Sequence, residues 1–360
     1  MQHIITTSVA LEKFAAHLAT APAIALDTEF LRERTYRAEL CLVQAATVEH
    51  AVCIDPFALP DLAALAPPLA VARCVKVMHA SRQDLEVLFP EVGPVRPVFD
   101  TQIAAALTGL PAQIGYGELV ARTLGIDLAK SHTRADWTRR PLPPEQIEYA
   151  LDDVLYLLPL KQSLEEQLDR LGRLGWLAEE LAALGDPQGF VVDPQQSWLR
   201  VKGLHGLDAG RQRLAQELAA WREQRAIKRN RPRKWILDDI ALREIVARVP
   251  RTLEGLGDIP ELAAGTIKHS GDELLALIQA VGISDPPPPL APRSRPDPDQ
   301  NALVKKLAAL NQTTAMELSL SPEILATRRD LEQLAEGRRD LPMLSGWRRG
   351  VIGERLLAAL

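Results

Sequence analysis

The chain has 360 residues, which is too long for one ordinary hydrophobic core and fits two or three domains. Its 47% hydrophobic and 25% charged residues exclude a disordered or fibrous chain, and no apolar run approaches the ~18 residues that a membrane-spanning helix needs. The net charge of −5 combines −9 over residues 1–192 with +4 over residues 193–360, a weak indication that the second part meets a polyanion.

The cysteines and the first residues bear on the compartment. Cys41, Cys53 and Cys74 are odd in number and scattered, which argues against a disulfide framework, and no cluster has zinc-ligand spacing. Charged residues interrupt the first twenty positions, so the apolar core of a signal peptide is lacking. We expect a cytoplasmic protein that does not enter a membrane.

Strand and helix patterns alternate in the first half of the chain. Strands are predicted at 23–27, 50–57 and 73–80, and helices at 11–19, 81–89, 100–110 and 117–126. The stretch 143–172 is helical throughout, with Pro143 and Pro144 in its first turn, and Pro159 predicts a kink or break within it. This alternation indicates an α/β domain.

Strand patterns end near residue 195, and the rest of the chain is predicted to be helical. Helices are expected at 211–230 and 236–250, followed by a proline-rich linker at 284–300. Residues 301–360 are again helical. The two helical blocks share a loose plan, which is either a degenerate repeat of a small module or a coincidence between helical hairpins.

Two acids lie two positions apart within the β-prone stretch IALDTEF at residues 24–30. Asp27 and Glu29 project from one face of a strand, because side chains alternate between its faces. One interpretation is an edge strand with a polar face. The other is half of a divalent-metal site, because two like charges side by side repel unless a cation lies between them. Ligands that are all oxygen favour Mg²⁺ or Mn²⁺.

A metal site of this kind needs further carboxylates from elsewhere in the chain. Asp84 begins a helix after an apolar strand, although an acid there is also favoured by the helix dipole alone. Tyr149 and Asp153 are four residues apart and share one face of a predicted helix, whereas Asp152 points about 100° away and is expected in solvent. A tyrosine and an aspartate at this spacing are common by chance, so the pair alone decides nothing.

Four stretches occur in an order that resembles a known enzyme superfamily. They are DTEF at 27–30, HASRQDLEVLF…FDTQIAAAL from 79 to 107, KSHTRADWTRRPLPPEQIEYA at 130–150 and YALDDVLYLLPL at 149–160. Together they are similar to the motifs of the DEDD 3′→5′ exonuclease superfamily, in its tyrosine-containing branch, and within it to the ribonuclease D family. The later helical blocks resemble the HRDC domains of that family, the first of them, in WREQRAIKRNRPRKWILDD, more than the second.

The resemblance implies a fold and a division into domains. The implied fold is an α/β ribonuclease-H-like exonuclease domain, with a mixed central sheet and flanking helices, followed by two small all-α HRDC-like domains. We expect the exonuclease domain at 1–195, the first HRDC-like domain at 208–284, a linker at 285–300 and the second HRDC-like domain at 301–360.

The resemblance also implies a catalytic site with two divalent cations, Mg²⁺ or Mn²⁺, that activate a water molecule and stabilise the departing oxygen. The implied ligands are Asp27, which bridges the cations, Glu29 and Asp153 at one cation, and Asp84 at the other. Tyr149 is expected to orient the attacking water, because a phenol with an ordinary pKa of about 10 is a poor base at neutral pH.

Residues beside the exonuclease motifs are candidates for holding an RNA 3′ end. Phe30 and Leu31 either wedge the terminal nucleotide or pack in the core. The basic residues before the catalytic helix either contact phosphates or belong to a solvated loop; they are Lys130, Arg134, Arg139 and Arg140. Trp137 is expected to pack structurally rather than stack on a base. His79 is expected in the core or behind the carboxylates rather than as a ligand.

The run KRNRPRK at 228–234 carries five basic residues in seven positions. Such a run is often only solvated, but beside a nuclease we expect Arg231, Arg233 and Lys234 to contact nucleic acid.

These observations predict a 3′→5′ exoribonuclease that releases nucleoside 5′-monophosphates. The resemblance implies precursor tRNA and other structured RNAs with single-stranded 3′ ends as substrates, and we expect a monomer. One alternative is the same chemistry on DNA, because nothing in the sequence reads the 2′-hydroxyl group. The other is a non-catalytic RNA-binding protein on a nuclease scaffold, which the intact carboxylates and Tyr149 disfavour.

Overall fold

The computed structural model describes residues 4–128, 135–182, 184, 187–281 and 298–360. The chain forms two compact units. Unit 1 contains residues 1–31, 40–188 and 296–360, and unit 2 contains residues 32–39 and 189–295. Most of the predicted linker at 284–300 lies outside the described residues, and its last three residues begin a helix.

Unit 1 is built on a mixed six-stranded sheet with the strand order β1-β4-β3-β2-β5-β6 among the described residues. The strands are β1 (Ile4–Ile5), β2 (Ala23–Leu31), β3 (Glu39–Ala46), β4 (Ala51–Ile54), β5 (Val75–Met78) and β6 (Val98–Asp100). The sequence predicted β2, β4 and β5 and did not predict β1, β3 or β6. Strand β3 is buried along almost its whole length, so its sequence ELCLVQAA lacks the alternation that marks a half-exposed strand.

The strand directions place three strand ends at one edge of the sheet. Strands β2, β5 and β6 are parallel neighbours, whereas β3 and β4 are antiparallel. Ala25 of β2 pairs with Val77 of β5, so Asp27 and Glu29 lie beyond the last pair, where β2 runs on past its neighbour. The segments that follow β5 and β6 therefore begin beside the acidic end of β2.

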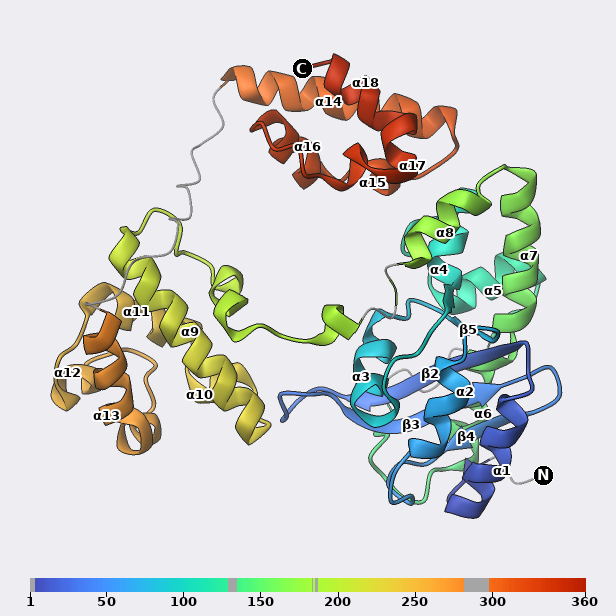
Figure 1. Ribbon diagram of the computed structural model, residues 1–360, viewed down its shortest axis with the longest axis horizontal. Coiled ribbons are helices and arrows are strands. Elements are labelled where there is room, and N and C mark those ends of the chain that lie inside the picture. The colour runs from blue at the N-terminus through green and yellow to red at the C-terminus, as the bar shows by residue number, and fades with distance from the viewer. Residues whose placement is uncertain (1–3, 129–134, 183, 185–186, 282–297) are drawn as a thin grey trace. The chain divides into compact units, whose positions relative to one another are not determined.

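Helices cover both faces of the sheet. Figure 1 shows α1 and α2 in front of the sheet and α6 behind it. Helices α6 and α7 pack against β2, α6 also against β4, and α7 also against β5. The helices of this part are α1 (Ser8–Leu18), η1 (Ala63–Leu65), α2 (Ala66–Ala70), α3 (Arg82–Val92), α4 (Thr101–Thr108), α5 (Tyr116–Leu124), α6 (Pro144–Leu155), α7 (Leu157–Arg170) and α8 (Leu174–Ala182).

The long helical stretch around the third motif is divided in two. Helix α6 ends at Leu155 and α7 begins at Leu157, which confirms the break that Pro159 predicts. Proline has no N–H group and its ring crowds the carbonyl group four residues earlier, so the helix cannot continue unchanged through this point. Helix α6 starts with Pro144 in its first turn, where the missing N–H group costs nothing.

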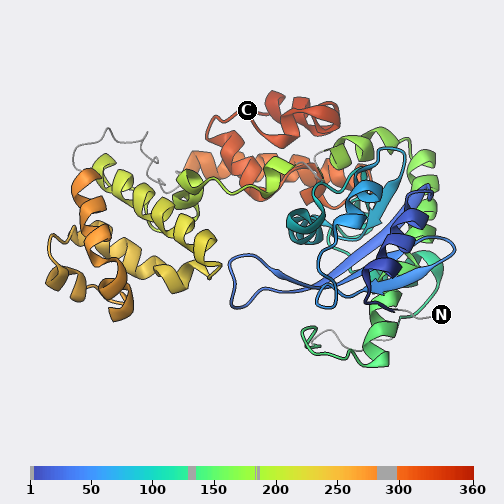
Figure 2. The same cartoon turned by 60° about the horizontal axis from the view of Figure 1, so that its bottom comes forward.

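The regular elements that the structure describes in unit 2 are all helices, and its residues 32–39 connect β2 to β3. Figure 2 shows this connection as the long blue loop that continues the two strands. A core that includes Trp198, Leu218, Leu242 and Leu274 joins its helices. They are η2 (Pro187–Phe190), η3 (Pro194–Arg200), α9 (Ala209–Arg229), α10 (Arg233–Ile236), α11 (Asp239–Arg248), α12 (Leu253–Gly257) and α13 (Ala264–Val281).

The last helices, which the sequence predicts as a second HRDC-like domain at 301–360, belong to unit 1. Leu307, Leu331 and Leu356 share one hydrophobic core with Leu157 and Leu164 of α7. The helices are α14 (Pro298–Glu317), α15 (Pro322–Leu325), α16 (Arg328–Ala335), η4 (Pro342–Leu344), α17 (Gly346–Arg348), the π-helical turn η5 (Arg349–Gly353) and α18 (Glu354–Ala358).

A stacked pair of tryptophans and the hydrogen bonds of Glu180 fix this C-terminal module, residues 298–360, to α8. The indole rings of Trp176 and Trp347 stack with centroids 4.3 Å apart and an interplanar angle of 9°. Glu180 accepts hydrogen bonds from the Trp347 indole N–H at 2.7 Å and from the Arg348 guanidinium at 2.5 Å. Both apolar and charged contacts therefore bind the module to the rest of unit 1.

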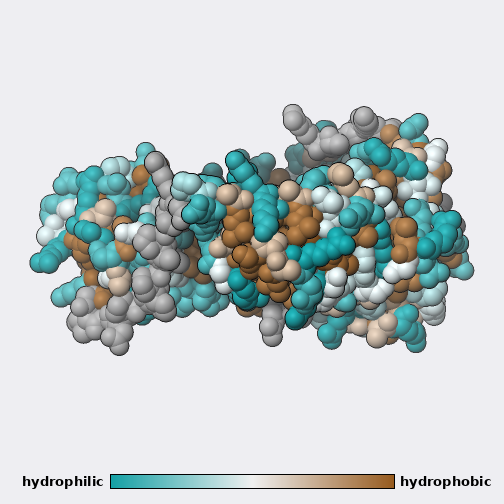
Figure 3. Space-filling model, turned by 90° about the horizontal axis from the view of Figure 1, so that it is seen from above, coloured by the Kyte–Doolittle hydropathy of each residue, from teal (hydrophilic) through white to brown (hydrophobic). Residues whose placement is uncertain are grey.

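The surface carries both polar and apolar side chains. Figure 3 shows hydrophobic residues gathered in places on one face and interrupted by hydrophilic ones. Within the described ranges, every helix is too short or too polar to cross a membrane.

Candidate active site

Three carboxylates meet at the end of β2 that runs past β5. Asp27 and Glu29 lie on β2, and Asp153 reaches them from α6, which packs against this strand. One carboxylate oxygen from each of the three residues lies within 4.8 Å of the others. The structure thus brings Asp153 to two acids that precede it by 124 and 126 residues in the sequence.

The fourth predicted acid, Asp84, lies in the first turn of α3, directly after β5. Its side chain is 8% exposed and accepts a hydrogen bond of 2.5 Å from the hydroxyl group of Thr28. Thr28 lies between Asp27 and Glu29 on β2, so this bond ties Asp84 to the acidic strand. Asp84 adjoins the group of three carboxylates without belonging to the closest set.

Burial raises the pKa values of all four acids, and charges within the group raise those of Asp27 and Glu29 further. The pKa of Asp27 is well above its ordinary value because of burial, followed by the charges of Asp84, Asp153 and Glu29. Burial and the same kind of repulsion raise the pKa of Glu29 to about 8. Burial, with the charge of Asp152, raises the pKa of Asp153 to about 7. Burial also raises the pKa of Asp84 to about 6, although the Thr28 hydrogen bond lowers it.

The donor set fits a hard divalent cation. All the converging ligand atoms are carboxylate oxygens, which Mg²⁺ and Mn²⁺ prefer. The neighbouring charges that shift the pKa values of these four acids are carboxylates, which raise them. A divalent cation would remove the repulsion that otherwise protonates the group.

Tyr149 lies one turn before Asp153 on α6 and joins the site from the helix side. Its ring lies against Trp137 at a centroid distance of 6.3 Å, which agrees with a packing role for that tryptophan. Burial, followed by the charges of Asp153, Glu29 and Asp27, raises the pKa of Tyr149 to about 12. The phenol is therefore protonated at neutral pH and is able to donate a hydrogen bond.

Asp100 is a supporting residue that the sequence did not single out. It ends β6 and caps α4, and its carboxylate accepts from the backbone N–H groups of Ala80 and Ser81 and from the Ser81 hydroxyl group. Ala80 has φ of +52°, which an L-residue adopts only when it is held there. Asp100 thus fixes the turn that aims Asp84 at β2. The only sequence signal was its place in the second motif.

His79 lies behind the carboxylates. One ring nitrogen is 2.9 Å from the Thr101 hydroxyl group and the other is 3.0 Å from the Ile114 carbonyl oxygen. Burial lowers the pKa of His79, so the ring is neutral at neutral pH. Both ring nitrogens have partners, which agrees with a core position rather than a metal ligand.

Two family models match the chain. The model described as 3′-5′ exonuclease matches residues 2–169, and the model of the HRDC domain matches residues 211–278. The first range contains all four acids and Tyr149.

Relatives match this chain over nearly its whole length. A ribonuclease D from Granulibacter bethesdensis is 39% identical over 99% of this chain and 91% of its own length. A ribonuclease D from a Jannaschia species is 41% identical over 100% and 95% of the two chains. The chain belongs to the ribonuclease D family.

The crystal structure of Escherichia coli RNase D, an exoribonuclease involved in structured RNA processing, is 31% identical and superposes with a TM-score of 0.90 over 100% of this chain and 98% of that one. The predicted family and fold class are thereby confirmed, and this ribonuclease D family member is a 3′→5′ exoribonuclease that acts on RNA. Its family uses divalent metal ions, which agrees with the acidic cluster.

The RNA-contact residues predicted beside the ribonuclease D motifs lie in different environments. Phe30 and Leu31 end β2 and are half-buried, and Arg139 is exposed. Lys130 and Arg134 lie outside the described residues.

Arg140, a candidate for phosphate contact, has other partners in the structure. Its guanidinium donates to both oxygens of Asp55, at 2.6 and 2.7 Å, and to the carbonyl oxygen of Cys41 at 2.8 Å. Asp55 is 3% exposed, so this pair ties the segment before α6 to the sheet.

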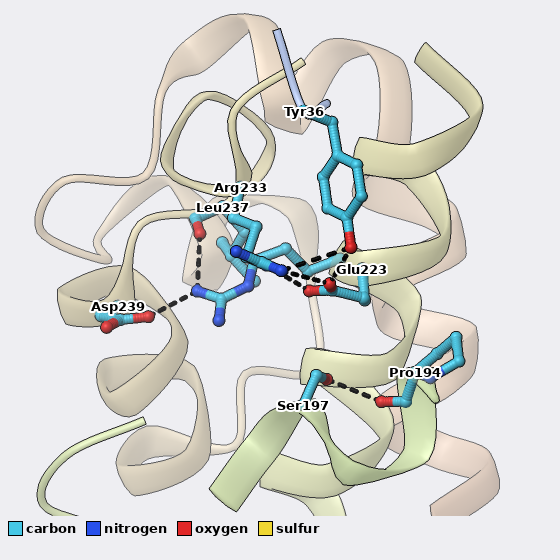
Figure 4. A network of polar contacts seen from close by, with 8 residues as sticks. Tyr36, Pro194, Ser197, Glu223, Arg233, Leu237 and Asp239 are labelled. Carbon is cyan, nitrogen blue, oxygen red and sulfur yellow. Dashed lines mark hydrogen bonds and ion pairs between the residues drawn. The ribbon is translucent and has the colours of Figure 1, made fainter. Parts of the chain in front are cut away.

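The basic run at 228–234, near the end of α9, also contains both exposed residues and a residue that is already paired. Arg231 and Lys234 are exposed. Arg233 instead forms a two-point ion pair with Glu223 at 2.6 and 2.7 Å, and its guanidinium lies 4.9 Å from the centroid of the Tyr36 ring. Figure 4 shows the Tyr36 hydroxyl group directed at the same carboxylate, to which it donates a hydrogen bond. RNA contact by Arg233 would have to compete with these partners.

Proposed function

We propose that this exoribonuclease shortens structured RNAs that carry short single-stranded 3′ tails, precursor tRNA among them, and releases nucleoside 5′-monophosphates. The observation that carries the proposal is the meeting of Asp27, Glu29 and Asp153, with Asp84 beside them, at the end of β2. The E. coli relative, described as an exoribonuclease involved in structured RNA processing, supports this class of substrate.

Two divalent cations, Mg²⁺ or Mn²⁺, would be held by the four acids. We assign Asp27 to both cations, Glu29 and Asp153 to one, and Asp84 to the other. Bound cations supply an activated water and stabilise the departing 3′ oxygen. The chain contributes the strand that carries Asp27 and Glu29, the Thr28 hydrogen bond that orients Asp84, and the Asp100 carboxylate that accepts from Ser81 at the start of α3.

Tyr149 would orient the attacking water by donating its hydroxyl hydrogen bond. Its raised pKa of about 12 supports orientation rather than proton removal. Phe30 and Leu31 would contact the terminal nucleotide, since both are half-buried at the end of the acidic strand. Lys130, Arg139, Arg231 and Lys234 would contact phosphates farther along the RNA, with Arg233 contributing only where its pair with Glu223 opens.

Further parts of the proposal concern organisation. We propose an exonuclease domain at 1–195, HRDC-like modules at 208–284 and 301–360, of which the second packs into the core of unit 1, and a linker at 285–300, in a monomer. A cytoplasmic location is supported by Cys41, Cys53 and Cys74, which are buried and form no disulfide.

The test compares Asp153→Asn with Asp152→Asn on a 5′-labelled RNA with a single-stranded 3′ tail. The two residues are adjacent on α6, but only Asp153 belongs to the carboxylate group. We expect Asp153→Asn, like Asp27→Asn, to abolish hydrolysis with Mg²⁺ or Mn²⁺ while RNA binding persists. Asp152→Asn should stay within a few-fold of wild type. Near-wild-type turnover by Asp27→Asn would refute the assigned mechanism.

A matched DNA oligonucleotide tests the substrate class in the same assay. The proposal expects faster shortening of the RNA and nucleoside 5′-monophosphates as the product. Equal or faster hydrolysis of the DNA would contradict RNA as the preferred substrate.

A further inference from the structure

A second group of possible metal ligands lies in unit 1 away from the four acids. His17 is in the last turn of α1, and Glu49 and His50 are in the turn between β3 and β4. One ligand atom from each of these residues lies within 4.8 Å of the others. None of the three belongs to the exonuclease motifs.

The turn that carries two of these residues is held in a fixed shape. The Thr47 N–H group donates to the His50 carbonyl oxygen at 2.8 Å, which closes the turn between the two strands. The Thr47 hydroxyl oxygen in turn accepts from the N–H groups of Glu49 and His50 at 3.3 and 3.2 Å. The side chains of Glu49 and His50 therefore project toward solvent from a backbone that these hydrogen bonds hold in one shape.

The third residue is oriented by the same threonine. The Nε2 atom of His17 is 3.0 Å from the Thr47 hydroxyl oxygen, whereas its Nδ1 atom faces Glu49 at 3.9 Å. The His17 and His50 rings meet edge to face with centroids 4.8 Å apart. The direction of the Nε2–Thr47 hydrogen bond depends on the His17 tautomer, and metal binding selects the tautomer that carries its proton on Nε2, whose Nδ1 lone pair faces Glu49. A metal-binding histidine is commonly held in this way through its second nitrogen.

We propose that His17, Glu49 and His50 bind one transition-metal ion of the borderline class, with Zn²⁺ as its probe. Two imidazoles and one carboxylate are ligands that Zn²⁺ accepts, in contrast to the all-oxygen group on β2. Ligand atoms around a tetrahedral Zn²⁺ lie roughly 3.3 Å apart, given bonds of about 2.0–2.1 Å. The side chain of Glu49 is 67% exposed and is free to rotate inward by the required distance.

The site has room for a fourth ligand. His17, Thr47 and Glu49 line a hollow of about 460 Å³, whose other walls include Lys161 and Gln162 of α7. Three protein ligands at the rim of such a hollow leave a coordination position for water or an exchangeable anion. Metal binding would also join the end of α1 to the β3–β4 turn, which should raise the melting temperature.

The test is a Zn²⁺ titration against a chromophoric chelator, using tag-free protein that carries Asp27→Asn and Asp153→Asn, in excess Mg²⁺. The two substitutions and the Mg²⁺ remove the oxygen-only site from the measurement. We expect one Zn²⁺ equivalent and a higher melting temperature when Zn²⁺ is present. His50→Ala, and His17→Gln, which keeps a hydrogen-bonding group near Thr47, should each weaken Zn²⁺ binding by ~10-fold or more.

His269→Ala is the matched control, because His269 is an exposed histidine in unit 2. It should change neither the affinity nor the Zn²⁺-dependent melting temperature. Absence of a bound equivalent, or equal affinities of the His50→Ala and His269→Ala proteins, would overturn the proposal. If Zn²⁺ bound elsewhere on the chain, the His50→Ala and His269→Ala proteins would have equal affinities for it.

Discussion

The four acids at the end of β2 are costly when no cation is present. Burial raises the pKa values of Asp27, Glu29, Asp84 and Asp153, and neighbouring carboxylates raise them further. A protein that kept this group only for stability would gain by replacing one carboxylate. The arrangement is therefore best explained by the cation chemistry of the ribonuclease D family.

The raised pKa values predict how stability depends on pH. Glu29 and Asp153 titrate at about 8 and 7 in the folded protein, against ordinary values near 4. Between about pH 4 and pH 8 the folded protein binds more protons than the unfolded chain, so the free energy of unfolding falls as the pH rises. Metal-free protein should melt at a lower temperature near pH 8 than near pH 5, and Mg²⁺ should raise the melting temperature more near pH 8.

Asp27→Asn isolates the repulsion in this group. Near pH 8 without metal, it should increase the free energy of unfolding, on the order of 1–2 kcal/mol, because one buried like charge is removed. Asp152→Asn should have a smaller effect. Chemical denaturation in a chelating buffer measures both, and a loss of stability in Asp27→Asn would contradict the assigned repulsion.

Tyr149→Phe tests the role of one hydroxyl group. The change should lower kcat by roughly 10²–10⁴-fold and leave the melting temperature nearly unchanged, if the group positions the water. Because the pKa of Tyr149 is about 12, kcat should show no loss from tyrosine ionisation at neutral pH. Single-turnover hydrolysis of labelled RNA measures the effect. A kcat within a few-fold of wild type would remove Tyr149 from the mechanism.

Sequence patterns located these side chains unequally well. A separation of two positions on a strand was enough to place Asp27 and Glu29 on one face. A separation of four on a helix aligned Tyr149 with Asp153. Asp100 was not identified, because its role depends on backbone N–H groups about 20 residues away, brought near by the pairing of β5 with β6.

At the scale of elements, the loop after the catalytic strand is a structural part of unit 2. The side-chain oxygen of Asn230 accepts from the N–H groups of Tyr36 and Arg37, both at 3.1 Å. The Glu223 side chain is fully buried, forms an ion pair with Arg233 and accepts a hydrogen bond from the Tyr36 hydroxyl group. Hydrogen bonds from these two partners outweigh the effect of burial and lower the pKa of Glu223. The pair should therefore be charged at neutral pH and stabilise the loop.

Arg233→Met and Arg231→Met separate this stabilising role from RNA contact. Arg233→Met leaves the Glu223 charge buried without its ion pair and should destabilise unit 2 by about 2–3 kcal/mol, less than for a fully buried pair because Arg233 is 39% exposed. Arg231→Met should leave stability nearly unchanged and reduce the salt dependence of RNA binding. Chemical denaturation measures the stability of each variant, and RNA binding at several salt concentrations measures the salt dependence. Equal stabilities of the Arg233→Met and Arg231→Met proteins would contradict a stabilising role for Arg233.

The sequence could not separate Arg233 from its neighbours. Arg231, Arg233 and Lys234 look alike in a basic run, and the partners of Arg233 come from ten residues earlier on α9 and from the distant β2–β3 loop. The same limit applies to Arg140, whose partner Asp55 lies 85 residues away. Composition shows that charge is present, whereas only the fold shows which charges are already paired.

At the scale of the whole molecule, the C-terminal module completes the core of unit 1. The sequence indicated helices after a proline-rich linker but gave no sign of where they pack. The contact depends on single residues such as Trp347 and Arg348, which follow no periodic pattern across the two segments. The fold class of each part was predictable from alternation and helical spacing, and the packing between distant parts was not.

Trp347→Ala tests this packing. The side chain is 8% exposed, and its loss should reduce the free energy of unfolding by about 3–5 kcal/mol, with a lower melting temperature for unit 1. Trp235→Ala, at a tryptophan that is 50% exposed in unit 2, is the control and should have little effect on unit 1. Calorimetry measures the unfolding of both variants. Similar small losses of stability in Trp347→Ala and Trp235→Ala would show that the C-terminal module is not part of the core of unit 1.

The most direct test of the central claim, that four acids from distant parts of the chain form one cation site, is a crystal structure of the wild-type protein soaked with Mn²⁺. Anomalous scattering then locates the cations. The account predicts two Mn²⁺ ions, one among Asp27, Glu29 and Asp153 and the other between Asp27 and Asp84. A map without Mn²⁺ at these carboxylates, from a protein that hydrolyses RNA in the same buffer, would contradict it.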